Sequence, residues 1–141
     1  MKFRVFLDTN VFIYSFEFPD SNSAGIIELL NQGKIEAITS ERVLKEVTHY
    51  FDKKHSLILA RKFRRFILDS CIIIMQNEML QEIETFKGKI KEKDAEQLAV
   101  TRKYGIKFLI SYDRDFEGVE EYVTPKNFLE IMKLKTKDSE F

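Results

Sequence analysis

Short apolar runs alternate with longer helical patterns along most of the chain, and this alternation is what most limits the fold. Five segments are rich in the β-branched and aromatic residues that favour strands: 3–7, 36–39, 71–75, 108–110 and a short candidate at 122–124. Strands separated by helical segments favour a parallel sheet with helices on both faces. The sequence therefore predicts an α/β protein with a central parallel sheet of four to five strands.

Helix signals fill the intervals between these strands. Ser40 and Ser56 each precede apolar residues at helical spacing, so they are expected to cap helices that run to about Lys54 and Asp69. The other helices are expected over about 9–16, 21–33, 78–87 and 92–104, and from Pro125 onward. The strand at 71–75 is apolar throughout, which predicts that it is covered on both faces.

Composition and length limit the class of protein. A chain of 141 residues favours one domain, predicted over 1–134 and followed by a charged tail at 135–141 that is expected to fray. Cys71 is the only cysteine, which excludes an intrachain disulfide and fits a cytoplasmic protein. No apolar stretch is long enough to span a membrane. Lys+Arg and Asp+Glu both number 23, so contact with a nucleic acid would have to come from local patches.

Acidic residues follow two of the predicted strands. Asp8 comes directly after the first strand, and Asp113 and Asp115 come shortly after the fourth. In open parallel sheets, ligands bind outside the carboxyl ends of the strands. If the first and fourth strands are neighbours, these carboxylates face each other, and a group of ionised carboxylates is a natural site for Mg²⁺ or Mn²⁺. Each acid alone also fits a simpler role, as a helix cap or a turn residue.

Two further acids lie at the edges of apolar helix faces. Glu46 borders the stripe of Val43, Val47 and Tyr50, and Asp94 opens the helix before the fourth strand. Such positions are commonly solvated flanks, or first-turn acids that the helix dipole favours. Spacing alone does not show that these segments converge on Asp8, so that step needs a fold.

The four acids, in this order and context, resemble the motifs of the PIN domain family. Asp8-Thr9-Asn10 after a strand is similar to the first motif, and Ser40 through Val47, with Glu46 in the acidic position, to the second. Lys93-Asp94-Ala95 is similar to the third, and Ser111 through Phe116, with Asp113, to the fourth. One departure is Thr101, where many members carry alanine. The resemblance covers about residues 3–133.

The resemblance implies a three-layer α/β/α PIN-like fold and a Mg²⁺- or Mn²⁺-dependent endoribonuclease that hydrolyses single-stranded or structured RNA. Many small members are toxins of VapBC-type toxin–antitoxin pairs, commonly homodimers whose acidic site an antitoxin protein covers. We expect Asp8, Asp94 and Asp113 to hold one divalent ion. Glu46 would hold or position a second ion or its water, with Asp115 assisting.

Other polar residues receive supporting roles. Asn10 and Ser111 are expected to orient the acids through hydrogen bonds, or simply to stabilise a cap or turn. The cations Arg61, Arg64 and Arg65 share one predicted helix face with Lys62, shortly after Lys53 and Lys54. These cations could guide RNA phosphates, although a solvated helix face is the commoner role.

Three alternatives remain beside the ribonuclease. A receiver-like phosphoacceptor domain would need an aspartate after the third strand, where Met75-Gln76-Asn77 stands. An aspartate-nucleophile phosphatase would need a second acid two residues after Asp8, where Asn10 stands. A catalytically inactive PIN module that binds RNA or acts as a scaffold would usually lack one of the acids, and none is missing here.

Overall fold

The computed structural model describes the chain except for residues 1, 87, 89–90 and 140–141 and the side chains of residues 92 and 93. In the described part, five parallel strands form one sheet in the order β3-β2-β1-β4-β5. The strands are β1 (Phe3–Leu7), β2 (Ile35–Ser40), β3 (Cys71–Ile74), β4 (Phe108–Ile110) and β5 (Tyr122–Val123). The predicted parallel sheet is confirmed, and the first and fourth strands are neighbours, which is the condition under which their acids face each other.

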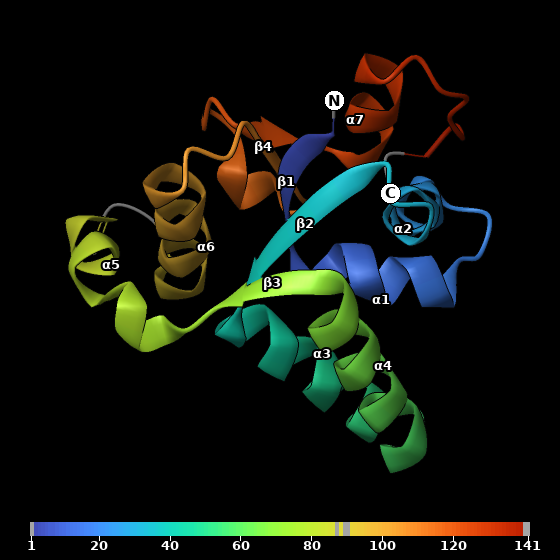
Figure 1. The fold of residues 1–141 in the computed structure, drawn as a ribbon, viewed down its shortest axis with the longest axis horizontal. Helices are drawn as coiled ribbons and strands as arrows, with labels where there is room; N and C mark the ends of the chain where they lie inside the picture. The colour runs from blue at the N-terminus through green and yellow to red at the C-terminus, as the bar shows by residue number, and fades with distance from the viewer. Residues whose placement is uncertain (1, 87, 89–90, 140–141) are drawn as a thin grey trace.

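The helices pack on both sides of this sheet. They are α1 (Thr9–Glu17), α2 (Asn22–Asn31), α3 (Glu41–Lys54), α4 (Leu57–Ser70), α5 (Leu80–Phe86), α6 (Glu92–Lys103) and α7 (Pro125–Ile131). Two short 3₁₀ helices, η1 (Gln76–Glu78) and η2 (Arg114–Phe116), lie between them. In Figure 1, α5 and α6 lie to one side of the sheet, and α1, α2 and α7 to the other. This is the expected three-layer α/β/α arrangement.

Local signals explain where several helices begin. The hydroxyl of Ser40 accepts a hydrogen bond from the Val43 amide (3.2 Å), and that of Ser56 accepts one from the Leu59 amide (3.1 Å). Each cap satisfies an amide that has no partner inside the helix. Pro125 stands at the first position of α7, as expected. The predicted helix end at residue 87 lies outside the described residues.

The core is built on β1, where Val5, Phe6 and Leu7 are fully buried. The helices α3 and α4 pack against each other through the stacked rings of Phe51 and Phe63, whose centroids lie 4.1 Å apart. Helix α3 begins directly after β2, so it lies at the carboxyl end of the sheet, and its second turn carries Glu46.

The third strand differs from the expectation that helices cover both of its faces, and that prediction was wrong. Strand β3 is the edge of the sheet, and its Ile72 side chain is 47% exposed. Its partner in the register, Ile38 on β2, is only 2% exposed. The apolar run therefore reflects strand propensity at an edge, and a sequence does not reveal strand order.

The residues after α7, whose charge pattern predicts fraying, contact α2. The Asn22 side chain accepts a hydrogen bond from the Lys137 amide (2.7 Å) and donates to the Ser139 carbonyl. Residues 140–141 of this tail lie outside the described residues. No helix within the described part of the chain has both the length and the apolar character needed to cross a membrane.

Candidate active site

The carboxyl ends of β1 and β4 open into an acidic cavity of about 190 Å³. Its wall combines segments from β1, α1, α3, α6 and the loop after β4, which are far apart in the sequence. The residues that line it are Asp8, Thr9, Asn10, Ile13, Glu46, Asp94, Gln97 and Asp113. The four acids expected at the site therefore surround one cavity.

Asp8 directly follows strand β1 and is 4% exposed. It caps α1, where one carboxylate oxygen accepts the Thr9 amide (2.7 Å) and the other accepts the Ser111 hydroxyl. Burial raises the pKa of Asp8 from 3.8 to about 6, and these two hydrogen bonds oppose the rise. The nearby carboxylates of Glu46 and Asp113 raise it further. The cavity thus favours either a proton or a metal cation on Asp8.

Ser111 connects the acids of the two neighbouring strands. Strand β4 places it beside Asp8, whose amide donates to the Ile110 carbonyl (3.1 Å). The Ser111 hydroxyl donates to Asp8 and accepts the Asp113 amide (2.9 Å). Asn10 ties the same loop to α1, because its side-chain oxygen accepts the Tyr112 amide (3.0 Å). Ser111 thus contacts an acid directly and Asn10 contacts the backbone of the loop, and their supporting roles at the site stay a prediction.

Asp94 brings an acid from α6 and is 1% exposed. One carboxylate oxygen each from Asp94, Asp113 and Asp115 lie within 4.8 Å of one another. Asp115 belongs to this group but does not line the cavity, whereas Asp8 lines the cavity but is not part of the group. The ammonium of Lys91 lies 2.8 Å from an Asp115 carboxylate oxygen, and this hydrogen bond and charge raise the pKa of Lys91.

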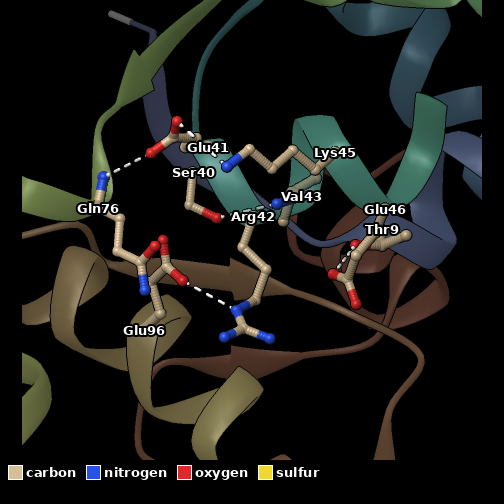
Figure 2. A network of polar contacts seen from close by, with 9 residues as sticks. All are labelled: Thr9, Ser40, Glu41, Arg42, Val43, Lys45, Glu46, Gln76 and Glu96. Carbon is tan, nitrogen blue, oxygen red and sulfur yellow. Dashed lines mark hydrogen bonds and ion pairs between the residues drawn. The ribbon is translucent and has the colours of Figure 1, made fainter. Parts of the chain in front are cut away.

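Glu46 reaches the cavity from α3. The hydroxyl of Thr9 donates to one of its carboxylate oxygens (2.8 Å), as Figure 2 shows. Thr9 thus orients Glu46, although α3 begins more than thirty positions later in the sequence. Sequence analysis placed Thr9 in the first motif but gave it no role of its own.

Two buried polar residues of α6 were missed by sequence analysis. Glu96 is 1% exposed and accepts a hydrogen bond from the Arg42 guanidinium (2.9 Å), a contact visible in Figure 2. Gln97 is 2% exposed and lines the cavity. The Oε1 atoms of both side chains have no hydrogen-bond partner among the described residues. Their position between the apolar residues Ala95 and Leu98 was the available signal in the sequence.

The cations of α4 lie elsewhere. Arg61, Arg64 and Arg65 are exposed, and none of them lines the acidic cavity. Arg61 and Arg65 border a different hollow together with Lys62 and Ile58. Contact of these arginines with RNA stays a prediction.

The donor set fits a hard divalent cation. Mg²⁺ and Mn²⁺ prefer oxygen ligands, and a Mg²⁺ site commonly uses a few carboxylates and several waters. The cavity offers carboxylates at the required spacing, and the Gln97 amide adds a buried neutral oxygen. Carboxylates so close together repel one another, and a cation relieves that repulsion.

The three-layer fold and the acids at the carboxyl edge of its parallel sheet place the chain among α/β proteins with an acidic site. The PIN domain family model matches residues 5–122, and the chain belongs to this family. A comparison with curated proteins gives no match.

Solved structures share the fold at low sequence identity. A toxin–antitoxin complex from Klebsiella pneumoniae matches with 23% identity and a TM-score of 0.69, covering 86% of this chain and 97% of that chain. The sarcin–ricin loop cleaving toxin VapC20 of Mycobacterium tuberculosis matches with 20% identity and a TM-score of 0.63, covering 81% and 93%. VapBC2 of Rickettsia felis, bound to a fragment of its promoter DNA, matches with 17% identity and a TM-score of 0.60, covering 86% and 96%.

Proposed function

We propose that the protein is an endoribonuclease that depends on Mg²⁺ or Mn²⁺. The observation that carries the proposal is the acidic cavity, where carboxylates from four separate segments meet at the ligand-binding edge of the sheet. Membership of the PIN domain family supports it, because the resemblance implies this chemistry. The products would carry a 5′-phosphate and a 3′-hydroxyl.

Each acid has a proposed role in this reaction. Asp8, Asp94 and Asp113 would hold the cation, and Asp115, close to the last two, would complete the group. A bound divalent cation would neutralise charge on the scissile phosphate and activate a water molecule. Glu46, oriented by Thr9, would hold a second ion or accept a hydrogen bond from the attacking water.

The neutral neighbours would keep these acids in place. Ser111 and Asn10 fix the loop that carries Asp113 against Asp8 and α1. Hydrogen bonds of this kind set the orientation of metal-binding carboxylates, and their loss typically lowers metal affinity. Gln97 would contribute a polar contact from the floor of the cavity.

The test compares wild type with Asp8→Asn on single-stranded RNA in Mg²⁺, Mn²⁺ or EDTA. Asp20→Asn is the matched control, because Asp20 is exposed and does not line the cavity. We expect the wild type and the control to cleave only with metal, and Asp8→Asn to lose at least about a hundredfold in rate. Equal cleavage by wild type and Asp8→Asn would exclude the assigned site. Absence of cleavage by every protein would favour an inactive RNA-binding or scaffold module.

A role as a VapC-type toxin is the finer part of the proposal. The structural neighbours include toxin–antitoxin complexes, which supports an antitoxin protein as partner. We also propose a homodimer in the cytoplasm, as the family resemblance implies. A small antitoxin-like reading frame beside the gene would favour a toxin, whereas an isolated gene would favour RNA processing.

A further inference from the structure

A second hollow adjoins the acidic cavity and runs along α3. It has a volume of about 500 Å³ and shares Ile13 and Glu46 with the acidic cavity. We call it the α3 groove. The residues that line it are Ile13, Glu46, His49, Tyr50, Lys53 and Lys54. A ligand leaving the acidic cavity past Glu46 would therefore enter the α3 groove.

Helical spacing explains how the lining residues form one path. His49 and Tyr50 lie three and four positions after Glu46, and Lys53 and Lys54 follow one turn later, so their side chains share a face of α3. From Glu46 to Lys54 the path covers about 12 Å along the helix axis. It joins a site that would hold divalent cations to a pair of lysines.

The two ends of the α3 groove differ in charge, with Glu46 at the end beside the acidic cavity and Lys53 and Lys54 at the other. Lys53 and Lys54 are exposed and, within the part of the chain that the structure describes, neither forms an ion pair. Two acids lie close to this end: the exposed Asp52 directly precedes Lys53 on α3, and Glu17 at the end of α1 contacts His55 and is hydrogen-bonded to Tyr50. The two lysines are therefore available to an anionic ligand.

We propose that the α3 groove binds the RNA strand on one side of the scissile phosphate, with Lys53 and Lys54 contacting backbone phosphates. This inference rests on the proposed ribonuclease function. It assigns the RNA path to α3 and not to the arginines of α4, whose hollow shares no residue with the acidic cavity. Binding in the α3 groove would also explain how a chain of zero net charge attracts RNA, because two cations stand beside the site.

The test compares two charge-matched double variants, Lys53→Gln/Lys54→Gln and Arg61→Gln/Arg65→Gln. Both remove two cations from exposed positions of a helix, and glutamine keeps helix propensity high. Binding to a fluorescent single-stranded RNA is measured by anisotropy with Ca²⁺ in place of Mg²⁺, over a series of salt concentrations. Thermal unfolding of each variant verifies that it is folded.

Each phosphate contact with a single strand contributes about 0.7 to the slope of log K against log salt. We therefore expect the lysine variant to lose about 1.4 from this slope, which corresponds to about a 25-fold loss of affinity near 0.1 M salt if the affinities converge near 1 M. The arginine variant should bind as the wild type does. Unchanged binding by the lysine variant, or an equal loss in both variants, would overturn the proposal.

Cleavage separates this inference from the proposed function. With Mg²⁺ or Mn²⁺, the lysine variant should lose kcat/KM on long RNA and keep the wild-type rate on a dinucleotide, which reaches only the acidic cavity. A loss on both substrates would mean that the lysines act on the cavity itself and would overturn the RNA path. If the wild type cleaves neither substrate, the proposed function fails, and the binding comparison still tests the α3 groove.

Discussion

Replacing Asp8 by asparagine should stabilise the metal-free protein at neutral pH while abolishing its proposed activity. The Asp8 carboxylate is buried, and its pKa is raised from 3.8 to about 6 because burial disfavours the charged form. The folded protein therefore binds the proton of Asp8 more tightly than the unfolded chain does. An asparagine has no such charge to bury.

The magnitude follows from the two pKa values. A rise from 3.8 to about 6 corresponds to about 3 kcal/mol at 1.36 kcal/mol per unit of pKa, a cost to folding that is complete well above pH 6. Well below pH 3.8 the carboxyl is protonated in both states, and the cost disappears. Asparagine can keep the cap to Thr9 but disturbs the hydrogen bond from Ser111, worth about 1 kcal/mol. The net gain near pH 8 is therefore about 2 kcal/mol.

Urea unfolding in EDTA, at about pH 5 and about pH 8, measures this difference. The advantage of Asp8→Asn over wild type should grow by about 1.4 kcal/mol between these conditions, because the hydrogen-bond loss does not depend on pH. Adding Mg²⁺ should stabilise the wild type at the higher pH and leave Asp8→Asn unchanged. A variant that is less stable than wild type by the same amount at both pH values would refute the reasoning.

Two further substitutions test the packing around the site. Arg42→Met should lower the free energy of unfolding by up to about 3 kcal/mol, because it leaves the buried Glu96 without its cation. The double variant Arg42→Met/Glu96→Met should cost much less, and equal costs of the two variants in urea unfolding would contradict this. Ile38→Thr should lower the free energy of unfolding by about 2 kcal/mol and Ile72→Thr by less than about 1 kcal/mol, because these register partners differ in burial. Similar shifts of the two variants in thermal unfolding would argue against an exposed edge at β3.

The elements of the fold could be predicted because their signals are local. Ser40 and Ser56 stand directly before apolar residues at helical spacing, and both cap helices in the structure. The run from Phe3 to Leu7 carries aromatic and β-branched residues, which favour a strand. Such preferences act within a few residues, so they are visible without knowing the tertiary structure.

The arrangement of the site could not be predicted in the same way, because it depends on strand order. The hydrogen bond between Ser111 and Asp8 exists only because β4 pairs with β1. The burial of Glu96 depends on α6 packing across the sheet, and the exposure of Ile72 on β3 lying at its edge. Spacing alone did not show that the acids converge on one site, and that expectation came from the resemblance to PIN domains.

The structural and the catalytic interpretations of these acids do not compete. Asp8 caps α1 and Asp113 caps η2, as two of the simpler alternatives expected. A carboxylate has about four lone-pair positions, so a cap and a neighbouring hydroxyl leave others for a cation. The cap then holds the acid rigidly where a ligand is needed. Asparagine at position 8 keeps the capping oxygen and removes the charge, whereas alanine would add about 1 kcal/mol of lost capping. Asparagine at position 8 therefore changes the charge and the hydrogen bond from Ser111 but keeps the cap, whereas alanine would also remove the cap.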